Sequence, residues 1–481
     1  MRLRTQRLPT RVLTLTVFLT VGAWHAVRPV SAQSTAPRGQ SALAGSVDAW
    51  AGIFAPPETD PPRPKSLTLS ASLYGGYDDN TAYGVDAKSP VPFFQSPGGL
   101  GGARLAAPYT RRGRSRAISL EGASQHARYP NLTDRLLNGY SGRVRFGSEI
   151  GRRTSLNTSF MAMYLPMFAL PFGATTQVFP SQYPMDLVGP VQTSVDVDAS
   201  SFGSFAYDSA ILLQESVNYD SRVNVIHRFD SKTSLAINGA SYLRDFRQND
   251  GGSSPWADTS VWSIGATVRR TIARGISARL GYGYGQARFA VPANLPLMRN
   301  HNINAGLDYN TTLPLTRRTS LAFSTGSGLM SRQLVEGSPA GVADTEGYLT
   351  ARATLSHHLG RTWLARFTYR RDLAYLDGFV EPTLAPWLNA AVSGALSRRT
   401  DAGIVGFWSD GRVGFFPLNG YRLWGGTGRV RFALARRASA FAQYTIQGHD
   451  FQDSVSLPFG FPNRFDRHSV RVGVSFWAPV F

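Results

Sequence analysis

The side chains best suited to acid–base chemistry in this sequence form two adjacent pairs. Asp78 is followed by Asp79, and His449 is followed by Asp450. A general base and the acid that orients it must be in hydrogen-bond contact. Both pairs lie in segments with a period of two, where neighbouring residues face opposite sides of a strand. We therefore expect neither pair to form a hydrolytic centre.

The histidines offer little for metal binding. His126, His227 and His301 stand alone, and the pair His357 and His358 has no nearby carboxylate cluster. The chain contains no cysteine, and the spacing typical of metal ligands is missing. A glycine loop for nucleotide binding is missing as well. We expect no metal, no other cofactor and no enzymatic activity.

Arginine is the charged residue that recurs. The chain has 50 Lys and Arg against 31 Asp and Glu, a formal charge of +19. Basic clusters on one helix or tail would indicate nucleic-acid binding, but these arginines are spread at regular intervals. Because the chain also carries an export signal, we expect no nucleic-acid partner.

The first 65 residues precede the regular part of the chain. Residues 1–32 combine Arg2, Arg4, Arg7 and Arg11 with an apolar run and end in Ser31-Ala32, the layout of a cleavable signal peptide. The apolar run of about 13 residues is shorter than the roughly 20 that a spanning helix needs. Residues 33–65 are rich in proline and predict an extended periplasmic segment.

From residue 66 to 481 the pattern predicts β-strands. In "SLTLSASLYGGY", Leu67, Leu69 and Leu73 share one face and Thr68 and Ser70 the other. The alternating segments run about 10 to 14 residues, longer than most strands of soluble proteins and long enough to cross a bilayer when tilted. Aromatic residues lie near the segment ends, as an interfacial girdle requires.

A basic repeat sets the number of strands. "GRRTSLNTSF" begins at Gly151 and "TRRTSLAFST" at Thr316, with looser copies elsewhere. Each basic pair marks a tight turn, and the turns recur about every 40 residues, a spacing that β-propeller blades also show. A blade has four short strands, whereas each unit here has two long ones. We predict an all-β, transmembrane antiparallel up-and-down β-barrel of about 18 strands, in the range of about 16 to 18, with both chain ends periplasmic.

The final strand carries a motif as well as a pattern. "RHSVRVGVSFWAPVF" places Arg471, Gly473, Phe476 and Ala478 at a polar-x-Gly-x-x-aromatic-x-hydrophobic spacing and ends in Phe481. This resembles the last strand of Gram-negative outer-membrane β-barrel proteins, porin-like ones included, although Pro479 interrupts the alternation. The resemblance implies insertion into the outer membrane by the barrel assembly machinery, with outer-membrane lipid and lipopolysaccharide as neighbours.

Alternation also predicts which charged residues face the interior. The basic ones are Arg143, Arg145, Arg222, Arg269, Arg279, Arg352, Arg366, Arg370, Arg429, Arg431 and Arg471. The acidic ones are Glu121, Glu149, Asp220, Asp308, Asp372 and Asp401. An arginine surplus in a pore raises the local concentration of anions, whereas pairing between strands would only solvate the wall. The sequence pattern is compatible with both anion enrichment and pairing between strands.

These patterns favour a porin-like channel for passive diffusion of small hydrophilic solutes, with a preference for anions. A TonB-dependent transporter would need a larger plug before its barrel, and an autotransporter would need a passenger domain. The remaining alternatives are a structural or export-associated barrel and, more remotely, an outer-membrane hydrolase.

One spacing in the basic repeat is about twice the usual one, which places a long external loop near residues 166–210. The loop carries Asp186, Asp196, Asp198 and Asp208, and we expect it to fold inward as a constriction opposite the basic wall. The alternative is an external lid or a partly disordered loop. Deleting residues 175–205 should then raise single-channel conductance in a planar bilayer. Unchanged conductance would exclude the constriction.

Overall fold

The structure is a computed structural model. It describes residues 64–81, 96–130, 136–166, 168–169, 210–212, 214–247, 258–290, 297–312, 318–333, 345–360, 362–375, 379, 381–414, 419–455, 457 and 461–480. All of them belong to one compact unit, Leu43–Phe481. The predicted signal peptide, nearly all of the proline-rich segment, the four aspartates of the predicted constriction loop and Phe481 lie outside these residues.

The alternating segments form long strands. Their bounds are β1 Lys65–Thr81, β2 Ser96–Arg112, β3 Arg116–Arg128, β4 Leu137–Ile150, β5 Thr154–Leu165, β6 Phe168–Ala169, β7 Ala210–Leu212, β8 Ser216–Arg228, β9 Thr233–Phe246, β10 Asp258–Ala273, β11 Ile276–Ala290, β12 Leu297–Thr312, β13 Thr319–Gln333, β14 Thr345–Leu359, β15 Trp363–Tyr375, β16 Pro382–Ala395, β17 Thr400–Val413, β18 Gly420–Ala435, β19 Ala438–Phe451 and β20 Arg464–Pro479.

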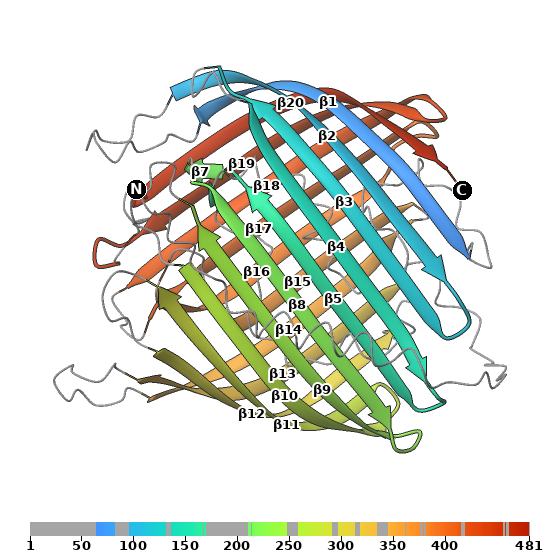
Figure 1. Cartoon of the computed structure of the whole chain (residues 1–481), viewed down its shortest axis with the longest axis vertical. Helices are drawn as coiled ribbons and strands as arrows, with labels where there is room; N and C mark the ends of the chain where they lie inside the picture. The colour runs from blue at the N-terminus through green and yellow to red at the C-terminus, as the bar shows by residue number, and fades with distance from the viewer. Residues whose placement is uncertain are drawn as a thin grey trace, which may run out of the picture. The chain divides into compact units, whose positions relative to one another are not determined.

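Eighteen of these strands close into a barrel (Figure 1). Each pairs antiparallel with its neighbours along the chain, β5 pairs with β8, and β1 pairs with β20 to complete the ring. The short strands β6 and β7 pair separately, between β5 and β8. The predicted up-and-down barrel and its strand number are confirmed.

Tight turns lie at the end of the barrel where β1 begins and β20 ends (Figure 1). Three of them use a glycine with positive φ, at Gly151, Gly275 and Gly360, a conformation that other residues adopt at a cost. The turn before β9 instead uses Asp230, whose Oδ1 accepts hydrogen bonds from the backbone N–H groups of Lys232 at 2.6 Å and Thr233 at 2.7 Å. These bonds hold the pKa of this exposed carboxyl below its usual range.

The outer face of the barrel is apolar. Exposed side chains include Leu73, Ile264, Leu280, Leu349 and Ile404, all more than half accessible. Residues of opposite parity on the same strands are buried or partly buried, as in β10, where Thr259, Val261 and Ser263 alternate with Trp262 and Ile264. Among the described residues no helix is long and apolar enough to cross a membrane. The exposed apolar side chains named above all lie on strands of the barrel.

The closing seam between β1 and β20 contains a buried ion pair. Arg467 Nε donates to both carboxylate oxygens of Asp78, at 2.9 and 2.8 Å, and both side chains are almost fully buried. Close by, Gly76 faces Arg471, and a Cβ at Gly76 would collide with the Val470 carbonyl oxygen and lie 3.1 Å from Arg471 Cγ. The seam therefore depends on particular residues as well as on the backbone ladder.

Replacing one partner of this pair should destabilise the barrel. In Asp78→Asn the Arg467 charge stays buried without its carboxylate, which costs about 3–5 kcal/mol. Urea unfolding, followed by the heat-dependent shift in gel mobility, should give a clearly lower midpoint. Asp410→Asn is the matched control, because its pair with Arg422 is exposed and worth about 0–1 kcal/mol. Equal midpoints for the two variants would contradict this assignment.

Candidate functional site

The inner face of the barrel wall carries the arginines that the alternation assigned to it. Arg269, Arg279 and Arg471 are buried there, and the others are partly buried. Three further arginines, Arg104, Arg244 and Arg467, share this face. Arg104 lies in the glycine-rich strand β2, where alternation is weak, and Arg244 lies between the inward aromatic residues Tyr242 and Phe246. For these two reasons the alternation of the sequence did not assign Arg104 and Arg244 to the inner face.

Several of these arginines are held by carboxylates. Asp308 accepts from Arg269 Nη2 at 2.6 Å and from Arg279 Nη1 at 2.8 Å. Arg431 contacts both oxygens of Asp401, at 3.1 and 2.5 Å. Such charge-assisted bonds hold the guanidinium groups in place. Because one carboxylate serves both Arg269 and Arg279, that group retains a net positive charge.

Other inner charges have different neighbours. Arg222 Nη2 lies 3.0 Å from Asp220 on its own strand, and Arg143 donates to Met161 Sδ at 3.2 Å although it is directly opposite Glu121 in the register. Arg429 lies over the Phe441 ring at 4.5 Å. Glu149 lies beside a tight turn and is exposed.

A second group of inner-face arginines lies on β14 and β15. Arg352 is directly opposite Arg370 in the register, and Arg366 follows on the same face of β15. Like charges directly opposite each other destabilise a sheet. Asp372 lies above them, where its Oδ1 accepts from the Leu373 N–H at 2.8 Å. We call Arg352, Arg366 and Arg370 the arginine triplet.

Two members of the triplet, Arg352 and Arg366, have unused hydrogen-bonding capacity at Nε. Within the described part of the chain, Arg352 Nε and Arg366 Nε are shielded from solvent and have no hydrogen-bond partner. A buried donor without a partner costs free energy, and a bound anion would remove that cost. The arrangement is suited to holding an anion by charge and by directed N–H groups.

An aromatic cluster lies at the opposite end of the barrel from the tight turns. It contains inward residues of β16 to β20, side chains of the connecting segments, and Phe246 of β9. Its members are Phe246, Phe379, Ala385, Trp387, Val413, Tyr421, Leu423, Phe451, Val455, Phe461 and Phe465. We call it the mouth cluster. Since β9 and β18 lie on opposite sides of the ring, it joins opposite walls.

His449 lies beside the mouth cluster. Its ring stacks between Phe461, at 4.9 Å, and Phe465, at 5.5 Å, and its Nε2 lies 2.8 Å from the Pro462 carbonyl oxygen, to which it can donate. Asp450 is exposed on the other face. The two residues are therefore not in contact as an acid–base pair.

The remaining candidate residues for catalysis or metal binding make other contacts. Asp78 pairs with Arg467, and Asp79 Oδ1 accepts from the His468 backbone N–H at 2.7 Å. His357 Nδ1 lies 2.7 Å from Thr319 Oγ1. In the described ranges, no three His, Asp or Glu side chains are grouped to hold a metal ion.

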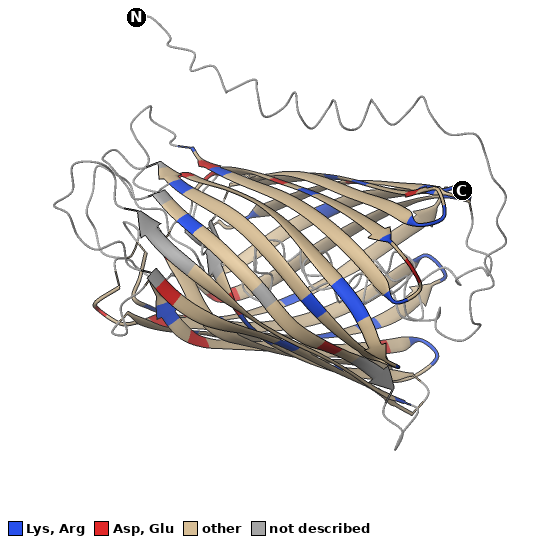
Figure 2. Cartoon of the chain, turned by 90° about the horizontal axis from the view of Figure 1, so that it is seen from below, with Lys and Arg blue, Asp and Glu red and all other residues tan. Residues whose placement is uncertain are grey.

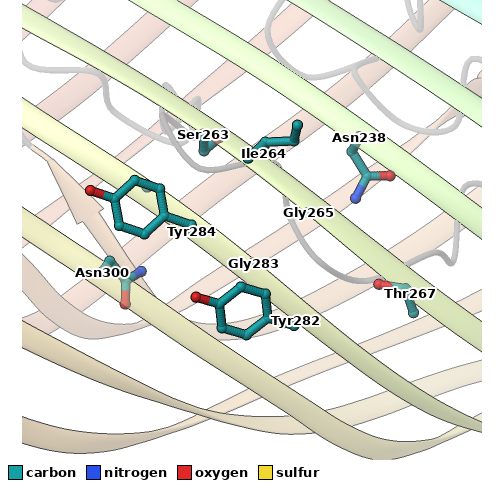
Figure 3. A pocket seen from close by; sticks show the side chains of 10 residues that line it. Asn238, Ser263, Ile264, Gly265, Thr267, Tyr282, Gly283, Tyr284 and Asn300 are labelled. Carbon is teal, nitrogen blue, oxygen red and sulfur yellow. The ribbon is translucent and has the colours of Figure 1, made fainter.

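A small pocket lies in the wall itself, across β9 to β12 (Figure 3). Gly265 and Gly283 are directly paired at its centre, so the wall carries no side chain there. Asn238, Ser263, Thr267 and Asn300 surround it together with Tyr282 and Tyr284. It contains no acidic, basic or histidine side chain and therefore offers no acid–base pair.

The closed antiparallel ring, its apolar outer face and its charged inner face define a transmembrane β-barrel. No protein-family model and no curated protein sequence matches the chain.

Among solved structures, the chain is similar to OccK2 (OpdF) of Pseudomonas aeruginosa, solved with glucuronate, at 10% identity and a TM-score of 0.41, covering 87% of this chain and 98% of that one. OpdL of the same organism gives 10% identity and a TM-score of 0.39, covering 87% and 99%. The FrpB iron transporter of Neisseria meningitidis gives 8% identity and a TM-score of 0.41, covering 86% and 81%.

Proposed function

We propose that this chain is an outer-membrane channel through which small hydrophilic solutes diffuse, with a preference for anions. Eighteen strands give a ring wide enough to enclose a water-filled path, and the inner wall is predominantly basic. The arginine triplet is the observation that carries the proposal, because opposed guanidinium groups are stabilised when an anion lies between them. No chemical step and no cofactor are involved.

The proposed orientation follows from the turns. In bacterial barrels the short turns are periplasmic and the longer loops external, which places the beginning of β1 and the end of β20 in the periplasm. On β20, Phe476 faces outward and is half exposed, while Arg471 and Gly473 face inward. We propose that these residues, with Ala478 and the terminal Phe481, are recognised by the barrel assembly machinery.

The mouth cluster limits passage in this proposal. It joins opposite walls on the external side, so solutes pass beside it. The same feature supports the second candidate, a structural or export-associated barrel in which packed aromatic residues block diffusion. The predicted inward loop with Asp186, Asp196, Asp198 and Asp208 remains a further prediction.

Planar-bilayer recordings under a salt gradient test the proposal. The wild-type protein should conduct in steps, with a reversal potential of the sign that anion flow produces. Replacing two members of the triplet, Arg352→Gln with Arg370→Gln, should lower the anion-to-cation permeability ratio by about two-fold or more, because inner-wall charge sets the local anion concentration.

Arg288→Gln with Arg422→Gln is the matched control for charge. Both residues are exposed and face outward near the external end, so this variant should keep the wild-type reversal potential. A cation-signed potential in the wild type would refute the anion preference, and the absence of any steps would favour the blocked barrel.

Removing aromatic rings from the mouth cluster should widen the path through the barrel. Phe379 stacks on Phe451 at 5.5 Å and meets Phe461 edge-on at 6.0 Å, so Phe379→Ala with Phe461→Ala removes two rings from its centre. Single-channel conductance should rise measurably. Phe323→Ala with Phe367→Ala removes two rings from the outer face and should leave conductance unchanged. Equal conductance in both variants would show that the cluster does not limit passage.

A further inference from the structure

The basic residues of the repeated turns form a ring at one end of the barrel. Figure 2 shows blue turns at the end where the chain terminates. All the basic residues described there are exposed. They are Lys65, Arg111, Arg112, Arg114, Arg116, Arg152, Arg153, Arg228, Lys232, Arg270, Arg274, Arg318, Arg398, Arg399, Arg436 and Arg437. We call them the basic collar.

Few exposed acidic residues lie near the basic collar. Glu149 and Asp230 are the exposed acidic residues at this end in the described segments. The Asp230 carboxylate is turned back onto the N–H groups of its own turn. At the opposite end the exposed charges are mixed and include Asp79, Asp245, Asp450, Asp453 and Asp466 with Arg128, Arg247, Arg288, Arg422 and Arg464. Among the described residues, the positive excess therefore lies at the turn end.

Turn geometry does not require these arginines. Glycines provide the positive φ at three turns. In another turn Ser397 Oγ accepts from the Arg399 backbone N–H at 3.1 Å. Arg153 is an exception, because its side chain donates to the Phe229 carbonyl oxygen at 2.9 Å and bridges two hairpins. The other collar residues have exposed side chains that can reach a ligand.

Apolar residues fix the level of the collar relative to a membrane. The last outward side chain before several turns is large and exposed, as at Ile150, Ile272, Leu396 and Leu434. Each lies within three residues of a collar arginine. Since the apolar band of such barrels ends where the hydrocarbon ends, the collar lies at the level of the lipid headgroups.

We propose that the basic collar binds the phosphate groups of anionic phospholipids in the periplasmic leaflet. Guanidinium groups form paired, charge-assisted bonds with phosphate oxygens, and an anionic lipid surface attracts basic residues that lie close to it. The ring would anchor the barrel at a fixed depth with this end in the periplasmic leaflet. This inference rests on the proposed outer-membrane location but not on conduction.

Lipid titration of the purified full-length barrel in neutral detergent tests the collar. Native mass spectrometry should show that phosphatidylglycerol binds about ten-fold or more tightly than phosphatidylcholine, and raised salt should reduce the difference because exposed charges are screened. Replacing Arg398, Arg399, Arg436 and Arg437 together by Gln removes four of the sixteen collar charges and should reduce the preference. The backbone carbonyls of Arg399 and Arg437 would still accept their bonds from Ala433 and Trp477.

The matched control replaces Arg128, Arg288, Arg422 and Arg464 by Gln, which removes the same charge at the other end, and it should keep the wild-type lipid preference. Equal preference in the two variants, or none in the wild type, would overturn the proposal. Binding to peptidoglycan sacculi without any lipid preference would overturn it too. A wild-type protein that prefers phosphatidylglycerol yet conducts nothing supports the collar and rejects the channel.

Discussion

The backbone hydrogen bonds of the sheet are the constraint on which this structure depends. Lipid cannot satisfy a free N–H or C=O group, so a sheet that crosses a bilayer must have no edge. The first strand, β1, therefore has to meet the last, β20, along its length. That pairing brings Asp78 and Arg467 together across 389 positions of sequence. In the observed register, this buried ion pair joins two strands that lie at opposite ends of the barrel sequence.

Much of the architecture could be predicted because a membrane barrel repeats one simple pattern. The spacing of the basic turns predicted the strand number, and alternation along β11 placed Leu280 on the outer face and Arg279 on the inner face. Alternation did not predict the inward position of Arg104, because this residue lies among glycines and alanines, where the two faces of the strand do not differ in polarity. Alternation also did not predict the Asp78–Arg467 contact, because the register at the closing seam depends on the shear of the closed ring. The mouth cluster was missed because its aromatic residues come from strands and connections that converge only in three dimensions.

The inner wall combines two kinds of arginine. Some, such as Arg279 and Arg431, are held by carboxylates and brace neighbouring strands. On β14 and β15, Arg352 and Arg370 are directly opposite each other, and like charges in that arrangement destabilise a sheet. The exposed arginines of the turns belong to neither group, since they face the membrane boundary.

Phe246 of β9 belongs to the same packed group as Tyr421 of β18 and Phe451 of β19, and this has a mechanical consequence. A thin cylindrical wall resists stretching along its hydrogen bonds but flattens easily into an oval. Aromatic packing that joins opposite sides acts as a cross-strut at one end of the cylinder. The mouth cluster therefore stiffens the end of the cylinder opposite the tight turns against flattening.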